Sequence, residues 1–369
     1  MIKRFYIHNY KCLENFELSI SEPTALLIGK NGAGKSSIRE AFELLQKIGR
    51  GINNIEKLIS DDDFSRGRKN SPIRFEIHVI LNQKEYKYTI VFELPGRFEK
   101  LRIKEENFSV SGEDIFTRKK AEVSLSGWNG TSQFTVDWHL VAFPLIHSPS
   151  ETEPISIFKK FLSQMVILSP VPSFISGYAK GETLELLKDG DNFSEWLSGI
   201  LTRYPAAYSV IYDYLKDGIL PDIQDFRSEK ESKDSQNWYV SFKNGSELIV
   251  DFGSLSDGEK CFFLCATILA ANKYMGPIFC FWDEPDNHLS ISEVSRFVAE
   301  LRKSFSDKGQ LIATSHNAEV IRAFSRENIY FVQRNSHLEP TQIKPLNDFS
   351  YKGDLINKLI LGDLEYEHK

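Results

Sequence analysis

The residues best suited to chemistry lie in a short glycine-rich segment near the N-terminus. Residues 29–36, GKNGAGKS, match the pattern G-x-x-x-x-G-K-[ST], in which backbone N–H groups curl around phosphate oxygens. Lys35 offers a positive charge to the β- and γ-phosphates, and the hydroxyl of Ser36 is a ligand for Mg²⁺. The residues expected to bind the nucleotide here are Gly29, Lys30, Asn31, Gly32, Ala33, Gly34, Lys35, Ser36 and Ser37.

The flanking residues predict the strand and the helix that such a loop requires. Ala25–Ile28 is an apolar run suited to a buried parallel strand, and apolar residues recur at helical spacing from Ile38 to Ile48. A strand, a glycine loop and a helix in this order form the context in which the pattern binds phosphate. The start of the helix adds a partial positive charge. The segment therefore predicts a nucleotide site.

A second anion site is indicated by the segment LSDGEK, residues 255–260. It directly precedes an apolar, helix-like run, so Ser256, Gly258 and the neighbouring N–H groups are expected at a helix N-terminus. A Ser-x-Gly turn on its own is usually only a helix cap.

Two apolar strands end in residues suited to hydrolysis. Ile278–Trp282 predicts a buried strand whose end presents Asp283, which can reach the Mg²⁺ ion, and Glu284, which can polarise the attacking water. The strand in Gln310–Asn317 ends near His316, and ligands bind at the carboxyl ends of adjacent parallel strands. The predicted catalytic residues are Glu284 and His316, and the predicted metal ligands are Ser36 and Asp283.

Composition places the chain among ordinary globular proteins. The 369 residues are 41% hydrophobic and 26% charged, with a net charge of −6, so any surface for nucleic acid must be a local patch. The four cysteines form no C-x-x-C pair, which favours a reducing compartment, and no apolar run approaches the length of a membrane span. We therefore expect a cytoplasmic protein without a membrane partner.

The remaining patterns predict an α/β fold with a mostly parallel core sheet. We expect an N-terminal part over residues 1–150, a helical insert over 151–237 and a C-terminal part over 238–369. Alternating residues over Ile73–Val141 predict an antiparallel β lobe. Expected helices are Phe158–Met165, Glu182–Leu187, Phe193–Leu201, Ala206–Leu215 and one through Leu355, Ile356, Leu359 and Ile360; expected strands are Ile2–Ile7, Glu14–Ile20, Trp238–Phe242 and Glu247–Val250; expected loops are Asn53–Asn70 and Ser228–Asn237.

In this order, the motifs resemble those of the ATP-binding cassette (ABC) superfamily. The segments 29–36, 255–259, 278–284 and 285–290 are similar to its Walker A, signature, Walker B and D-loop, and His316 is similar to its switch histidine. The opening IHNYKCLENFELSI resembles the start shared by RecF, SMC and OLD-type ATPases, and Glu259 in DGE fits that branch better than the transporter branch.

The resemblance implies an ATPase that forms a homodimer around two ATP molecules. The signature of one protomer, with Ser256, Gly258 and Glu259, would complete the ATP site of the other. Tyr10 and Lys11 lie where family members approach the nucleotide. The glutamine that usually senses the γ-phosphate has no clear counterpart: the three candidates Gln46, Gln83 and Gln164 lie in unconvincing contexts, and the acidic stretch Asp61–Asp63 is a candidate to fill that loop instead.

Several functions remain open on the sequence alone. The chain resembles stand-alone heads such as the PtuA-type ATPases, which implies a switch in DNA maintenance or antiphage defence beside a separate nuclease or effector, with double-stranded DNA as a candidate partner. About 50 residues follow His316, fewer than a TOPRIM nuclease needs, and we find no coiled-coil heptads. The alternatives are an ATP-gated scaffold for a protein partner and, with less support, a transporter ATPase subunit. Two weaker patterns are a PD…ExK-like nuclease arrangement (Asp222, Glu231, Lys233) and a basic patch (Arg66, Arg68, Lys69, Arg118, Lys119, Lys120).

Overall fold

A mostly parallel sheet forms the centre of the molecule and confirms the predicted α/β class. The computed structural model describes residues 1–96, 100–127, 130–147, 150–217 and 219–348. The strand order is β10-β15-β16-β3-β17-β18, and every pair is parallel except β17 with β18. The strands are β3 (Thr24–Ile28), β10 (Val166–Leu168), β15 (Phe279–Asp283), β16 (Gln310–Thr314), β17 (Ile329–Gln333) and β18 (Gln342–Pro345).

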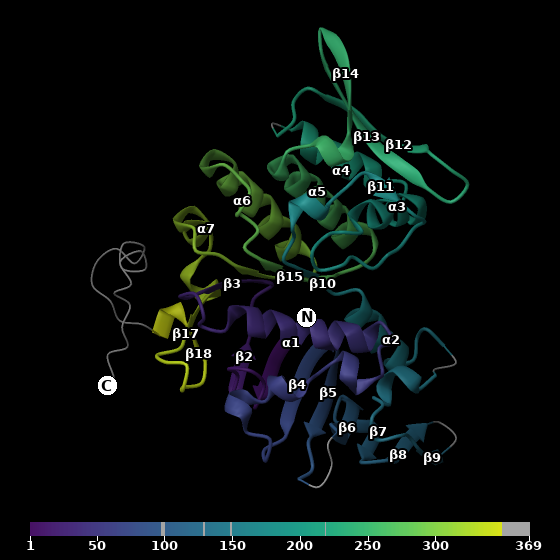
Figure 1. The fold of residues 1–369 in the computed structure, drawn as a ribbon, viewed down its shortest axis with the longest axis vertical. Coiled ribbons are helices and arrows are strands. Elements are labelled where there is room, and N and C mark those ends of the chain that lie inside the picture. The colour runs from purple at the N-terminus through teal and green to yellow at the C-terminus, as the bar shows by residue number, and fades with distance from the viewer. Residues whose placement is uncertain (97–99, 128–129, 148–149, 218, 349–369) are drawn as a thin grey trace.

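The predicted β lobe is an eight-stranded antiparallel sheet below this centre (Figure 1). Its order is β2-β1-β4-β5-β6-β7-β8-β9, so the two N-terminal strands join the lobe and do not enter the parallel sheet. The strands are β1 (Ile2–His8), β2 (Phe16–Ser19), β4 (Ile73–Leu81), β5 (Lys84–Glu93), β6 (Arg102–Val110), β7 (Glu113–Lys119), β8 (Glu122–Gly127) and β9 (Gly130–Thr135).

Helices α1 (Lys35–Gly49) and α2 (Pro154–Ser163) lie between the two sheets (Figure 1). The ring of Phe42 on α1 is 4.5 Å from Phe5 of β1 and 4.8 Å from Phe279 of β15, measured between centroids. The apolar face of α1 therefore joins both sheets into one buried core.

A second core covers the opposite face of the parallel sheet. The side chain of Phe279 faces α1, and Trp282 faces α6, where its ring centroid is 5.5 Å from Phe297. Burial on both faces explains why this strand is a continuous apolar run. The covering helices are α3 (Phe193–Arg203), α4 (Ala207–Lys216), α5 (Asp257–Tyr274), α6 (Ile291–Asp307) and α7 (Ala318–Ala323).

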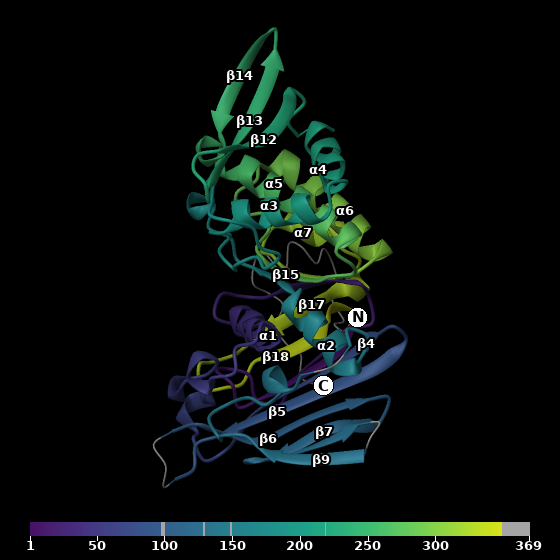
Figure 2. The same ribbon diagram turned by 90° about the vertical axis from the view of Figure 1, so that its right-hand side faces the viewer.

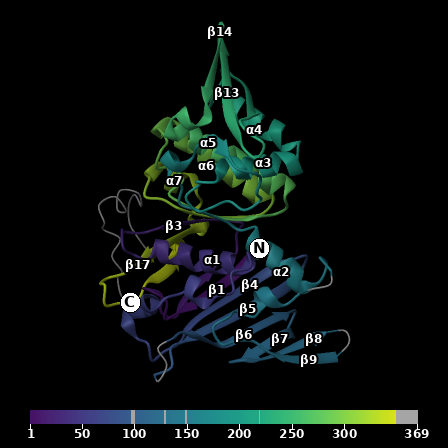
Figure 3. The ribbon, with the colours of Figure 1, turned by 45° about the vertical axis from the view of Figure 1, so that its right-hand side comes forward.

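A third sheet contains the strands predicted at Trp238–Phe242 and Glu247–Val250 and adds β11 and β12 within the region 151–237, which also holds helices α2, α3 and α4. Its strands are β11 (Tyr178–Ala179), β12 (Ile223–Lys230), β13 (Gln236–Asn244) and β14 (Ser246–Asp251), and the β13–β14 hairpin projects from the end far from the lobe (Figures 2 and 3). Both ends of the expected loop Ser228–Asn237 are therefore strand, because β12 and β13 pair there, and residues 231–235 connect them. The boundary at residue 237 falls within β13, and the helix expected at Glu182–Leu187 does not form.

The connection over Asn53–Asn70 is folded against the N-terminal segment, which the polar sequence did not indicate. It contains three short 3₁₀ turns, Ile55–Lys57, Asp61–Asp63 and Ser65–Gly67. The N–H of Lys11 donates to the carbonyl of Asp63 at 2.6 Å, and the N–H of Ser65 donates to the carbonyl of Asn9 at 3.0 Å. Backbone hydrogen bonds therefore hold this segment in place, although its sequence has no apolar pattern that would predict a folded structure.

Arg118 does not belong to the basic patch that the sequence offered as a weaker pattern, although Lys119 and Lys120 are exposed. The Arg118 side chain is 0% exposed and pairs with Glu106, because the alternation of β7 turns it into the lobe. Arg66 and Arg68 pair with Glu14, and Lys69 pairs with Asp61 at 2.7 Å.

The nuclease-like arrangement is also wrong. Asp222 precedes β12 and Glu231 follows it, so the two carboxylates stand about 30 Å apart along the strand. Among the described residues, no group of three or more His, Cys, Asp or Glu side chains is placed to hold a metal ion. No described helix combines the length and apolar character of a membrane crossing. The helix expected at Leu355–Ile360 lies outside the described residues.

Candidate nucleotide-binding site

The glycine loop connects β3 to α1 and is packed against the far end of the sheet. A Cβ on Gly29 would lie 2.0 Å from the carbonyl oxygen of Val332 in β17, so only glycine fits this crossing. Gly34 precedes α1 with φ of 110°, a conformation that L side chains rarely adopt. A Cβ there would also meet the hydroxyl of Thr341 at 2.5 Å. The glycines therefore allow both the turn and the close packing.

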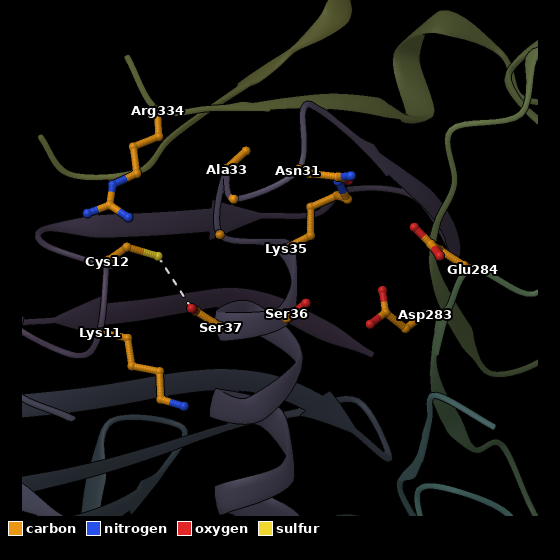
Figure 4. Close-up of a pocket in the computed structure, with 12 residues that line it drawn as sticks. Lys11, Cys12, Asn31, Ala33, Lys35, Ser36, Ser37, Asp283, Glu284 and Arg334 are labelled. Atoms are coloured by element: carbon orange, nitrogen blue, oxygen red, sulfur yellow. Dashed lines mark hydrogen bonds between the residues drawn. The ribbon is translucent and has the colours of Figure 1, made fainter. Parts of the chain in front are cut away.

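The loop borders an open cavity of about 460 Å³ (Figure 4). Residues from the N-terminal segment, the loop, the end of β15 and the end of β17 surround it. They are Lys11, Cys12, Asn31, Gly32, Ala33, Gly34, Lys35, Ser36, Ser37, Asp283, Glu284 and Arg334. The structure thus brings the glycine loop together with the two acidic residues from more than two hundred positions away in the sequence.

Hydrogen bonds from the neighbouring strand hold the acidic residues at the end of β15. The Thr314 hydroxyl donates to Asp283 Oδ1 at 2.6 Å and accepts from the Glu284 N–H at 3.0 Å. The backbone of Glu284 has φ of 51°, a left-handed conformation that is strained for a non-glycine residue. Asn287 donates to Glu284 Oε2 at 2.6 Å. These contacts fix the direction of the Glu284 carboxylate.

His316 reaches the same site from the end of β16. Its Nε2 lies 3.0 Å from Lys35 Nζ and 3.5 Å from Glu284 Oε1. Burial and the nearby Lys35 charge lower the pKa of His316, against the opposing charges of Glu284, Asp286 and Asp283. Burial also lowers the pKa of Lys35. A neutral imidazole beside an ammonium group can accept its hydrogen bond.

The oxygen donors present fit a magnesium ion. Ser36 and Asp283 line one cavity, and a hydroxyl with one carboxylate is the usual protein contribution to Mg²⁺ in nucleotide sites. Arg39 Nε lies 3.4 Å from Asp283 Oδ2, so the carboxylate already faces a cation from α1. When bound, Mg²⁺ would supply charge neutralisation for the phosphates.

Comparison with known proteins agrees with this geometry. The family model of the RecF/RecN/SMC N-terminal domain matches residues 1–338. The chain belongs to this family. Its structure is that of an ABC-type ATPase of the RecF/SMC branch, so the transporter-subunit alternative loses its support. No curated protein sequence is similar enough to count as a match.

Solved structures similar to this chain include three SMC heads. An SMC head bound to the C-winged helix domain of ScpA has a TM-score of 0.55 at 15% identity, covering 94% of this chain and 99% of that chain. The SMC head domain from Thermotoga maritima has a TM-score of 0.48 at 17% identity, covering 93% of this chain and 98% of that chain. An SMC head domain with an extended coiled coil, bound to the C-terminal domain of ScpA derived from Pyrococcus furiosus, has a TM-score of 0.49 at 14% identity. The match covers 98% of this chain and 99% of that chain.

The segment 255–259, which the sequence predicts to be a signature, does not line the cavity of its own chain. Ser256 caps α5, and its Oγ accepts from the Glu259 N–H at 3.3 Å, while Glu259 Oε2 accepts from the Ser256 N–H at 2.8 Å. A Cβ on Gly258 would lie 3.1 Å from the carbonyl of His288. The segments predicted to be the signature and the D-loop therefore pack together, and Ser256 is exposed.

Three other residues predicted for the site do not line the cavity. Gly29 and Lys30 do not line the cavity, but their carbonyls accept from Lys35 Nζ at 2.6 and 3.4 Å. Lys11 lines the cavity, whereas Tyr10 is buried against Phe75.

The sequence left the sensing glutamine open, and the structure places none of the three candidates at the cavity. Gln46 is buried in α1 and donates to the carbonyl of Met165 at 2.6 Å. Cys12 and Arg334 line the cavity without having been predicted. No sequence pattern marks Arg334, because only the folding of β17 beside β3 brings it to the loop.

Proposed function

We propose that this protein binds and hydrolyses ATP with Mg²⁺ and uses the cycle to switch another macromolecule. The observation that carries the ATPase proposal is the meeting of Lys35, Asp283 and Glu284 around one cavity. A phosphate-binding cation, a metal ligand and a general base are the parts that phosphoryl transfer to water requires.

Each residue has a role that its contacts support. Lys35 and the loop N–H groups neutralise the phosphates, and Ser36 with Asp283 holds Mg²⁺. Glu284, held by Thr314 and Asn287, polarises the attacking water. His316 is within hydrogen-bond distance of Lys35 and beside Glu284, so it is suited to contact the γ-phosphate or the water.

We propose further that two copies close head-to-tail around two ATP molecules. Ser256 is exposed at the N-terminus of the 18-residue helix α5 and lies outside the cavity of its own chain. Placed against the cavity of a second copy, this helix end would direct its N–H groups and the Ser256 hydroxyl toward the γ-phosphate. ATP would then join the two heads, and hydrolysis would release them.

The output we propose is control of a DNA-related process, in antiphage defence or DNA repair, through a separate nuclease or effector subunit. One observation favours the second candidate, an ATP-gated scaffold for a protein partner. Four of the six basic residues that were candidates for phosphate contacts have acidic partners in this chain: buried Arg118 with Glu106, and at the surface Arg66 and Arg68 with Glu14 and Lys69 with Asp61.

Steady-state ATP turnover with and without linear double-stranded DNA tests these proposals. Glu284→Gln should bind ATP with unchanged affinity and turn it over at least about a hundredfold more slowly, because the amide cannot take a proton from water. The same variant with ATP should sediment as a dimer, and adding Ser256→Arg should return it to a monomer. Several-fold stimulation of wild type by DNA would support the DNA-related output.

The opposite results are equally informative. Turnover indifferent to DNA would favour the scaffold, and wild-type turnover by Glu284→Gln would remove Glu284 from the role of general base. If Glu284→Gln sediments as a monomer with and without ATP, the head-to-tail dimer is refuted.

A further inference from the structure

The cavity has a phosphate end and an opposite end that the proposed hydrolysis does not use. Figure 4 shows Asp283 and Glu284 on one side of the start of α1, and Lys11, Cys12 and Arg334 on the other. Phosphates held by Lys35 and Ser36 beside the two acidic residues leave the nucleoside to extend toward this second group. The nucleobase is therefore expected near Lys11, Cys12 and Arg334.

Arg334 is fixed at this end by the loop that joins β17 to β18. Its Nε donates to the carbonyl of Glu339 at 2.8 Å, and its Nη2 donates to the carbonyl of His337. The loop is itself attached to the N-terminal segment, since the Thr341 N–H donates to the carbonyl of Cys12 at 2.9 Å. One edge of the guanidinium is thus anchored, and Nη1 has no hydrogen-bond partner among the residues that the structure describes.

The other two side chains at this end already have partners within the protein. Lys11 Nζ pairs with Glu40 and lies 3.6 Å from Asp63 Oδ1. The Cys12 thiol donates to the Ser37 hydroxyl at 3.3 Å. None of the described residues that line the cavity is aromatic, so Arg334 carries the one planar side-chain group among those three.

We propose that Arg334 is the platform on which the base of the bound nucleotide stacks, and that it sets the affinity for nucleoside triphosphates over bare polyphosphate. This inference rests on the proposed ATP site. A guanidinium plane stacks on π-systems and adds a cation–π attraction, and a fixed plane loses little freedom on binding. Because any base offers a π-face, the contact favours purines by area and excludes no base outright.

Calorimetric titration of the purified protein with ATP and with inorganic tripolyphosphate tests the proposal. Arg334→Ala should raise the Kd for ATP by about five- to thirtyfold and leave the Kd for tripolyphosphate unchanged. Arg334→Lys keeps the charge but loses the plane, so it should behave like the alanine variant. Arg334→Tyr should recover ATP affinity without the charge. Arg322→Ala, a change at an exposed arginine of α7, is the matched control and should alter neither Kd.

The outcomes separate the two proposals. Equal weakening of ATP and tripolyphosphate by Arg334→Ala would place Arg334 on a phosphate and overturn the stacking platform. Unchanged binding of both ligands would overturn it as well, and so would full ATP affinity in Arg334→Lys. If wild type binds neither ligand, the proposed nucleotide site itself fails.

Discussion

Replacing Arg118 by methionine tests the buried ion pair inside the antiparallel lobe. The side chains of Arg118 and Glu106 are both 0% exposed, and Nη1 lies 3.3 Å from Oε2. Arg118 also donates to the backbone carbonyls of Lys120 at 2.5 Å, Leu140 at 2.6 Å and Asp137 at 2.9 Å. Methionine occupies a similar path but leaves three carbonyls and a carboxylate without this donor.

The expected loss of stability depends on whether Glu106 stays charged without its partner or takes up a proton. Removing one partner of a buried pair costs about 3–5 kcal/mol. Glu106 can limit the loss by taking up a proton, and neutralising a carboxyl of ordinary pKa 4.5 at pH 7 costs about 3.4 kcal/mol. Tyr88 and the N–H groups of Ala142 and Phe143 still donate to it. We therefore expect Arg118→Met to lose about 3–4 kcal/mol at pH 7.

The pH dependence of this loss has a definite sign. Burial already raises the pKa of Glu106, and losing Arg118 raises it further. The folded variant then holds a proton that the unfolded chain has released, so its stability falls as the pH rises above the ordinary carboxyl pKa. Lowering the pH from 7 to 5 should reduce the deficit relative to wild type by at most about 1.4 kcal/mol per pH unit, because wild type, in which the pKa of Glu106 is also raised, gains stability over part of the same range.

Urea unfolding followed by circular dichroism at pH 5, 6 and 7 measures these values. Arg322→Met, at an exposed site, is the control and should stay within about 0.5 kcal/mol of wild type. Adding Glu106→Gln to Arg118→Met should restore part of the stability, because a neutral amide replaces the unpaired charge. A deficit below about 1 kcal/mol, or one that ignores pH, would refute the reasoning.

Three further predictions concern the nucleotide site. Asp283→Asn should weaken Mg²⁺-dependent ATP binding by on the order of tenfold but leave binding in EDTA intact; equal loss in both conditions would remove Asp283 from the metal site. The pKa of His316, followed by NMR in the ligand-free protein, should lie below 6.5 and rise in Lys35→Met, since burial and the Lys35 charge both lower it. Its stabilising contribution should therefore be lost as the pH falls below 6.5, and a value at or above 6.5 would contradict the geometry. Gly34→Ala should abolish ATP binding in a folded protein, because φ of 110° and the Thr341 hydroxyl 2.5 Å from the new Cβ leave no room; retained affinity would show that the loop can shift.

Local patterns were sufficient where the chemistry and the element are encoded in one segment. Residues 29–36 carry both the glycines and the cation of the loop, and the apolar run before Asp283 announces a strand buried on both faces. The parallel sheet followed from such runs, since a strand covered on both sides must be apolar throughout. For the same reason, the order of motifs was enough to indicate the family that the comparisons then showed.

Tertiary structure decided what depends on partners far away in the chain. The polar run Ser228–Asn237 looks like a loop, but pairing between β12 and β13 makes both of its ends strand and leaves residues 231–235 as the connection. The charges near Arg118 look solvated, but the face of β7 on which Arg118 lies is enclosed and Glu106 stands opposite. Arg334 has no local signature, and it reaches the glycine loop because β17 pairs with β3 and not with its sequence neighbour β16. The sequence alone therefore predicted the residues that act within their own segment. The contacts between distant segments depend on the order of the strands, because that order is the one that leaves few exposed edges and little exposed apolar surface over the whole chain.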